Sequence, residues 1–121
     1  MALRTVLVVD DSHTDRLFLT ELLEQQGLQV RTAGNAEEAY ARLAEARPDL
    51  ILMDVVMPGT NGYQLTRTIG RDPRYGDIPI ILCTVRNQAT DRLWGLRQGA
   101  RACISKPANR AELLAAMDTV R

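Results

Sequence analysis

Five short apolar segments alternate along the chain with stretches of helical periodicity, and this alternation restricts the fold more than any other feature. Val6–Val9 and Ile80–Cys83 are unbroken apolar runs, which are typical of strands buried on both faces of a parallel sheet. The second segment alternates apolar and polar residues and is expected nearer a sheet edge. The five predicted strands are Thr5–Val9, Leu28–Thr32, Leu50–Met53, Ile78–Cys83 and Arg101–Ile104.

The segments between these strands carry the amphipathic spacing of helices. Asn35 and Asn109 each precede such a segment and are expected to act as N-caps. Gly27 and Gly99 follow two of the helices and are expected to end them. One predicted helical face consists of Ala36, Ala39, Tyr40, Leu43 and Ala44.

The resulting (βα)5 order predicts a five-stranded parallel sheet covered by helices on both faces. A length of 121 residues fits one domain, residues 1–121, without an output domain. With right-handed crossovers, the favoured topology is the flavodoxin-like doubly wound α/β sheet with strand order 2-1-3-4-5. Ligands of such sheets bind at the carboxyl ends of the strands, so functional residues are expected there.

Composition excludes several classes of function. Lys and Arg together number 15, as do Asp and Glu, so the formal net charge is zero and a strongly basic nucleic-acid binder is disfavoured. No apolar run approaches the roughly 20 residues that span a bilayer, and the N-terminus carries no secretory signal. We therefore expect a cytoplasmic protein without membrane insertion. Cys83 and Cys103 show no metal-binding spacing and are expected to be buried thiols.

Polar residues gather where the predicted strands end. Asp10 and Asp11 close the first strand, Asp54 the third and Thr84 the fourth, while Lys106 follows the fifth. The first and third strands are neighbours in the expected sheet, so three carboxylates converge in one crevice. Crowded carboxylates repel unless a cation is present, and Mg²⁺ is the hard, oxygen-seeking ion that suits them.

Taken singly, each of these residues has an ordinary structural explanation. An Asp at a strand end is often a turn residue or a helix cap. Ser12 can cap the first helix by itself, however, which leaves the acidic pair less easily explained. Together the five residues suit phosphoryl transfer: Asp54 as the carboxylate nucleophile, Lys106 as the neutralising cation and Thr84 as a hydrogen-bond donor.

With these residues in place, the chain resembles the receiver domains of two-component response regulators, the CheY-like family. The resemblance covers residues 4–120. It is carried by Val8–Ser12, Asp54–Gly62 with its DxxMPxxxG string, Thr84, and Lys106–Pro107. The resemblance implies phosphoryl transfer from a CheA-like histidine kinase, followed by hydrolysis that the domain itself assists.

The same resemblance assigns the metal site residue by residue. Asp54 is implied as the phospho-acceptor. Asp11 and Asp54 are implied as direct Mg²⁺ ligands, joined by the backbone carbonyl of Val56. Asp10 is implied to act through water.

Thr84 and Lys106 are implied to contact the phosphoryl group and to carry the switch. Many receivers have Tyr or Phe three residues before this lysine, where this chain has Cys103, so the usual aromatic switch cannot operate. By analogy with the family, we expect docking on the surface of the fourth helix, fifth strand and fifth helix, including Trp94, Arg97 and Cys103.

Dephosphorylation is expected to be tuned by residues beside the acceptor. Val85 stands after Thr84 where a small residue is common, and Arg86 follows it. We hypothesise that Val85 and Arg86 slow or redirect attack by water or small phosphodonors, together with Val56 on the acceptor loop. His13, beside the acidic pair, is expected to be a solvated residue of the first helical turn.

A closer likeness is to the stand-alone receivers of type IV pilus twitching-motility systems, of the PilH kind. The stretches Val56–Gly59, Asn61–Gln64, Trp94–Gly95 and Arg97–Arg101 carry it. No DNA-binding module follows the last helix, so we expect a monomer that docks on a downstream protein or drains phosphate from a sibling regulator.

Two other classes of function compete with this interpretation. A pseudo-receiver that binds partners without phosphorylation is the alternative. The intact five-residue set argues against it, but the missing aromatic at Cys103 keeps it open. A small flavin-binding or phosphatase enzyme on the same sheet is disfavoured, because the first loop lacks a Gly-rich phosphate cradle and no general acid is evident. We therefore expect a signalling protein with phosphoryl-accepting and self-dephosphorylating activity.

Overall fold

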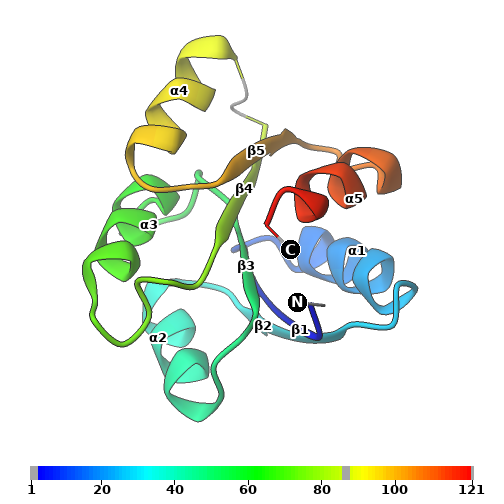
Figure 1. Cartoon of the computed structure of the whole chain (residues 1–121), viewed down its shortest axis with the longest axis horizontal. Coiled ribbons are helices and arrows are strands. Elements are labelled where there is room, and N and C mark those ends of the chain that lie inside the picture. Colours follow the sequence, from blue (N-terminus) through cyan, green and yellow to red (C-terminus); the bar gives the residue numbers. More distant parts are fainter. Residues whose placement is uncertain (1–2, 86–87, 121) are drawn as a thin grey trace.

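The computed structural model describes residues 3–85 and 88–120, in which five strands alternate with five helices (Figure 1). The strands are β1 (Thr5–Val9), β2 (Gln29–Ala33), β3 (Leu50–Met53), β4 (Ile80–Thr84) and β5 (Ala102–Ser105). The helices are α1 (His13–Glu24), α2 (Ala36–Glu45), α3 (Gly62–Arg71), α4 (Ala89–Arg97) and α5 (Arg110–Asp118). None of these helices is long and apolar enough to cross a membrane.

The five strands form one parallel sheet in the order β2-β1-β3-β4-β5, which confirms the predicted topology. Helices α1 and α5 cover one face and α2, α3 and α4 the other, as Figure 1 shows. Each face has its own apolar cluster, with Leu23 and Met117 in one and Leu43 and Ile69 in the other. The central strands β1, β3 and β4 are buried on both sides, as their unbroken apolar sequences predict.

Three strands begin one or two residues later than predicted, and in two cases the cause is a local hydrogen bond. Leu28 is buried, but its N–H donates to the Leu23 carbonyl and so closes α1 instead of joining β2. Ile78 is likewise buried while its N–H donates to the Tyr75 carbonyl in a turn. Burial alone therefore misplaces the boundary. The strands concerned are β2, β4 and β5.

The predicted helix caps are confirmed. Oδ1 of Asn35 accepts from the N–H of Glu38 at 2.8 Å, and Oδ1 of Asn109 accepts from the N–H of Glu112 at 2.7 Å. The predicted apolar face of α2 is correct except for Ala44, which is exposed. Eight residues beyond the first member of that face, Ala44 has rotated about 80° around the helix axis, away from the sheet.

The loop that follows β3 is held against the start of α3 by a glycine. The N–H of Gly62 donates to the carbonyl of Val55 at 2.9 Å. A Cβ at this position would lie 2.8 Å from the carbonyl carbon of Asp54 and 2.8 Å from Cα of Val55, with the Asp54 carbonyl oxygen closer still. The obstructing atoms are backbone and cannot rotate away. Glycine at position 62 therefore fixes how α3 meets the carboxyl end of β3.

Replacing Gly62 with Ala is expected to destabilise the protein by about 2–3 kcal/mol, because the new Cβ forces the Asp54–Val55 backbone to move. Gly70→Ala is the matched control, since a Cβ there meets nothing within 4 Å in the same helix. That control should be neutral or stabilising by up to about 1 kcal/mol. Urea unfolding monitored by circular dichroism measures both changes. Equal stabilities of the two variants would contradict the close approach.

Candidate functional site

Three carboxylates meet at the carboxyl edge of the sheet. Asp10 and Asp11 follow β1, and Asp54 follows the neighbouring strand β3. One oxygen from each of the three lies within 4.8 Å of the others. Asp10 and Asp54 are 1% and 6% exposed, whereas Asp11 is exposed. The predicted convergence of these three residues is thus present in the folded chain.

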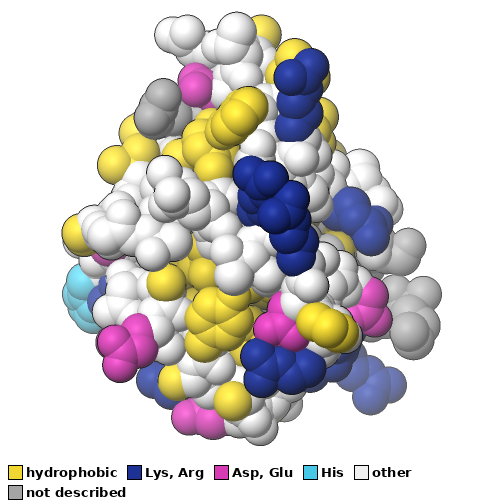
Figure 2. Space-filling model, turned by 90° about the vertical axis from the view of Figure 1, so that its left-hand side faces the viewer, with side chains coloured by type: hydrophobic (Ala, Val, Ile, Leu, Met, Phe, Trp, Pro, Cys, Tyr) yellow, Lys and Arg dark blue, Asp and Glu magenta, His cyan; other side chains and the backbone are white. Residues whose placement is uncertain are grey.

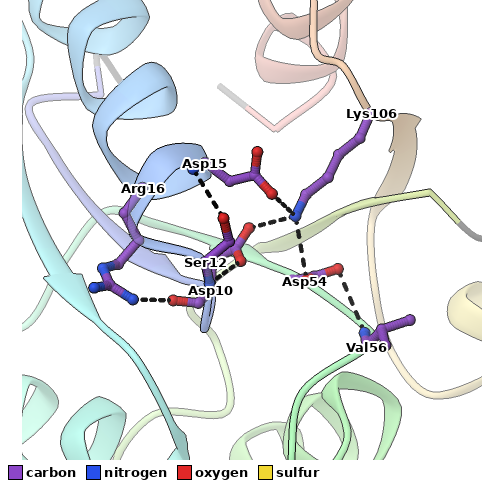
Figure 3. A network of polar contacts seen from close by, with 7 residues as sticks. All are labelled: Asp10, Ser12, Asp15, Arg16, Asp54, Val56 and Lys106. Carbon is purple, nitrogen blue, oxygen red and sulfur yellow. Dashed lines mark hydrogen bonds and ion pairs between the residues drawn. The ribbon is translucent and has the colours of Figure 1, made fainter.

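Lys106, on the loop after β5, reaches into this acidic pocket (Figure 3). Its Nζ lies 2.6 Å from Oδ2 of Asp10, 2.8 Å from Oδ2 of Asp15 and 3.2 Å from Oδ2 of Asp54. Its backbone N–H donates to the Thr84 carbonyl at 3.1 Å, which ties the loop to the end of β4. Lys106 is the only lysine in the sequence, and its side chain is 10% exposed.

Asp15 belongs to the pocket but was not predicted from the sequence pattern. Its N–H donates to the Oγ of Ser12, the N-cap of α1, and its carboxylate turns toward Lys106. The sequence does contain a signal for this contact. Ser12 caps the helix directly after the acidic pair, so Asp15, three positions later, lies in the first helical turn beside the strand end. An acidic residue there also favours the helix dipole, so an ordinary explanation hid its contact with the pocket.

The position of Asp10 is fixed on several sides. Its Oδ1 accepts from the N–H of Ser12 at 2.9 Å, while its Oδ2 is taken by Lys106. Its backbone carbonyl accepts from Nη1 of Arg16 at 2.7 Å, a contact that Figure 3 also shows. Both carboxylate oxygens of Asp10 are therefore already engaged within the chain.

The pKa values of Asp10 and Lys106 are both raised, but for different reasons. Burial raises the pKa of Asp10, although the hydrogen bonds from Lys106 and Ser12 oppose the rise. For Lys106, burial acts to lower the pKa, but hydrogen bonds to Asp10 and Asp15 and the charge of Asp54 outweigh it and raise the pKa. Lys106 therefore remains an ammonium at neutral pH.

The donor set fits a hard divalent cation. Three carboxylates contact the single ammonium group, and that of Asp11 lies close to two of them, so the ionised pocket keeps an excess of negative charge. Oxygen donors from carboxylates are the ligands that Mg²⁺ takes in proteins, usually together with waters. Because the Asp11 carboxylate is exposed, a cation can reach it from solvent.

Of the other residues predicted for the chemistry, Thr84, Val85 and Val56 lie at or after the carboxyl ends of β4 and β3. Thr84 is buried at the end of β4, and Val85, directly after it, is 72% exposed. Val56 is half exposed, and its N–H lies 3.4 Å from Oδ1 of Asp54. Arg86 lies outside the described residues. His13 is exposed at the start of α1, as expected.

The predicted docking residues lie outside the acidic pocket. Trp94, on α4, is half exposed and packs edge-on against Tyr63 with ring centroids 6.5 Å apart. Arg97 is exposed at the end of the same helix. The prediction of two buried thiols is correct for Cys83, whose pKa burial raises to about 12, and wrong for Cys103, which is partly exposed. Cys103 lies on the edge strand β5, which has a neighbouring strand on one side only.

Comparison with known proteins identifies the family. The model of the response regulator receiver domain matches residues 6–118. The chain belongs to the receiver domain family. Protein PilH of Pseudomonas aeruginosa is 44% identical over 115 residues, which are 95% of each chain. The phosphate regulon regulator PhoB of Escherichia coli is 38% identical over 117 residues, and the chain spans about half of its length, 51%.

Solved receiver structures share the fold. The chemotaxis protein CheY4 of Vibrio cholerae superposes with a TM-score of 0.90 at 32% identity, covering 99% of this chain and 100% of its own. A response regulator from Chloroflexus aurantiacus gives 0.91 at 29% identity and 98% coverage of both. As a receiver domain, the chain is a two-component signalling protein with a phosphodonor kinase and downstream partners. Receiver domains generally bind Mg²⁺ at an acidic pocket.

Lys106→Met is expected to lower stability by about 2–3 kcal/mol at neutral pH without added metal, because it leaves buried carboxylates without their cation. The loss of Lys106 also removes contributions that lower the pKa of Asp10. A raised folded-state pKa means that stability is greatest at low pH and falls as pH rises through that pKa. The deficit relative to wild type should therefore grow as pH rises from the ordinary Asp pKa of 3.8 toward neutral pH.

Urea unfolding at a series of pH values measures this change. Lys106→Arg, which keeps the positive charge, is the control and should retain most of the stability at neutral pH. A Lys106→Met variant as stable as wild type at every pH would show that the ammonium group does not balance the pocket.

Proposed function

We propose that the chain accepts a phosphoryl group on Asp54 from the phosphohistidine of a histidine kinase, in a Mg²⁺-dependent reaction. The observation that carries the proposal is the geometry of Asp54, which is buried at 6% exposure yet lies 3.2 Å from the single ammonium of the pocket. A carboxylate in this position can attack the phosphorus atom as the bond to the histidine nitrogen breaks. Hydrolysis of the resulting acyl phosphate by water returns Asp54.

The proposed ligand roles follow the resemblance to receiver domains. We assign Asp11 and Asp54 as direct ligands of the cation, together with the backbone carbonyl of Val56. The hydrogen bonds that the carboxylate oxygens of Asp10 accept, at 2.9 and 2.6 Å, are shorter than those that Asp54 accepts, at 3.4 and 3.2 Å, which supports an indirect role of Asp10 through water. When bound, Mg²⁺ supplies positive charge that stabilises the phosphoryl oxygens during transfer.

Lys106 and Thr84 are assigned to the phosphoryl group itself. Lys106 stays protonated because its pKa is raised, so it can offset the added negative charge when Asp54 is modified. The hydroxyl of Thr84 is assigned as a hydrogen-bond donor to a phosphoryl oxygen. The hydrogen bond from the Lys106 N–H to the Thr84 carbonyl supports a joint role for the two residues. Such donors stabilise charge that develops during the reaction.

We further propose that residues 1–121 act as a single cytoplasmic receiver domain and a monomer. The likeness to PilH over 95% of both chains supports a role in type IV pilus twitching motility, with a CheA-like kinase as the phosphodonor. Output would then pass to a downstream protein, or the domain would drain phosphate from a sibling regulator.

Asp54→Asn is expected to abolish phosphorylation, since no other carboxylate of the pocket is assigned as the acceptor. The assay mixes the protein with Mg²⁺ and a phosphorylated histidine kinase, with acetyl phosphate in parallel, and follows the added phosphoryl mass. Asp77→Asn, which changes an exposed carboxylate on the surface, is the control and should label like wild type. Labelling of Asp54→Asn would reassign the acceptor. Failure of wild type with every donor would instead support a pseudo-receiver.

Val85→Ala is expected to speed acetyl-phosphate labelling and hydrolysis by roughly threefold, which corresponds to a barrier lower by about 0.6 kcal/mol. Val85 follows the buried Thr84 directly, and its 72% exposed side chain is in a position to shield a phosphoryl group from solvent. Time courses of labelling and of loss with excess Mg²⁺ measure both rates. Rates equal to those of wild type would remove the shielding hypothesis.

A further inference from the structure

A groove of about 480 Å³ runs between α3 and α4, away from the acidic pocket. Its walls carry three arginines and one tryptophan. Figure 2 faces this side of the molecule and shows dark-blue Lys and Arg side chains gathered next to hydrophobic ones. The lining residues that matter are Arg67, Arg71, Gly76, Trp94, Arg97 and Gly99.

Among the residues that the structure describes, the three arginines of this groove have no acidic partner. Within residues 3–85 and 88–120, none of their guanidinium groups forms an ion pair with a carboxylate. Arg67 and Arg71 stand four residues apart on α3, a spacing at which like charges repel. By contrast, Arg31 and Arg42 share an ion pair with Glu45, and Arg74 pairs with Asp72. On a chain of zero net charge, the groove is a local cationic site.

The shape of the groove provides an apolar anchor beside these charges. Trp94 is 50% exposed, and its ring is held at 85° against that of Tyr63. The hydroxyl of Tyr63 donates to the carbonyl of Asp91, which ties α3 to α4 beneath the tryptophan. Gly70 and Gly99 add no side chains, and a Cβ at either would meet nothing within 4 Å. A preorganised, half-exposed tryptophan beside arginines is the composition of a binding hot spot.

We propose that the α3–α4 groove docks an acidic segment of a protein partner, with carboxylates on Arg67, Arg71 and Arg97 and an apolar side chain on Trp94. Charge complementarity selects the partner, because three guanidinium groups without a carboxylate partner in the described part of the chain favour carboxylates in bidentate geometry. The zero net charge of the chain favours a protein over a nucleic acid, whose binding depends on a wider cationic surface.

The docking residues predicted from the sequence do not all lie in the α3–α4 groove. Trp94 and Arg97 line the α3–α4 groove, whereas Cys103 lines a separate cavity with Arg92 and Leu96 on the β5 side of α4. The groove therefore lies on the other side of α4 from β5. Docking there does not require phosphorylation of Asp54, so its test stands apart from that of the proposed function.

The test titrates unphosphorylated protein with a synthetic peptide of Glu residues interrupted by Leu and Phe, following backbone amide shifts and the anisotropy of a labelled peptide. Wild type is expected to bind with shifts at Arg67, Arg71, Trp94 and Gly99. Arg67→Gln combined with Arg71→Gln should weaken binding by about tenfold or more. Trp94→Ala should weaken it by about tenfold as well.

The matched control combines Arg4→Gln with Arg101→Gln, which removes two exposed positive charges outside the groove. Its affinity should stay within about twofold of wild type. A peptide with Gln in place of Glu should not bind measurably. Equal weakening by both double variants, shifts confined to β5 and α5, or no binding of the acidic peptide at millimolar concentration would overturn the proposal. Tighter binding of a single-stranded oligonucleotide at the same amides would assign the groove to nucleic acid instead.

Discussion

The contact of one lysine ammonium with two buried carboxylates is the constraint on which the rest of this molecule depends. Asp10 and Asp54 are nearly inaccessible to solvent, and two ionised carboxylates in such a setting repel each other. Lys106 relieves this repulsion at distances of 2.6 and 3.2 Å and is itself kept charged by the same groups. Because the acidic groups outnumber it, the pocket still favours a further cation. Binding of such a cation to the folded state would add to the stability of the fold.

The parallel sheet explains why these groups meet although they are far apart in the chain. Lys106 is 96 residues from Asp10 and 52 from Asp54. In a parallel sheet every strand delivers its next residue to the same edge, so adjacent β1 and β3 bring their terminal carboxylates together. β5 lies beyond β4, and the length of the lysine side chain spans the remaining separation. Glycine at position 62 then allows α3 to begin against the backbone of the acceptor loop.

Much of this arrangement was predictable from the sequence, because it follows from the hydrophobic pattern of the strands and from the positions of the polar residues after them. Unbroken apolar runs identify central strands, and the residues after them identify the pocket, so Asp10, Asp11 and Asp54 could be placed together in advance. Strand starts were less predictable, since Leu28 and Ile78 are buried like strand residues but hydrogen-bond in turns. Asp15 escaped because a first-turn acidic residue has an ordinary helical explanation.

Side-chain surroundings on the surface could not be predicted from spacing alone. The same apolar pattern that marks a helix leaves Leu93, Trp94 and Leu96 about half exposed, because only Gly95 of α4 is buried against the sheet. A Cβ on Gly95 would lie 2.6 Å from Cδ1 of Leu82 and 3.0 Å from Sγ of Cys103, so the helix approaches the sheet through its smallest residue. The position of α4, and with it the α3–α4 groove, depends on this contact between helix and sheet.

The carboxylates of the acidic pocket are expected to hold Lys106 as an ammonium. Because this is the only lysine in the chain, labelling with ¹³C at Cε gives a single lysine signal, whose chemical shift can be followed against pH while the methyl spectrum shows that the protein stays folded. The signal is expected to remain that of an ammonium beyond the ordinary lysine pKa of 10.5. A midpoint at or below that value would contradict it.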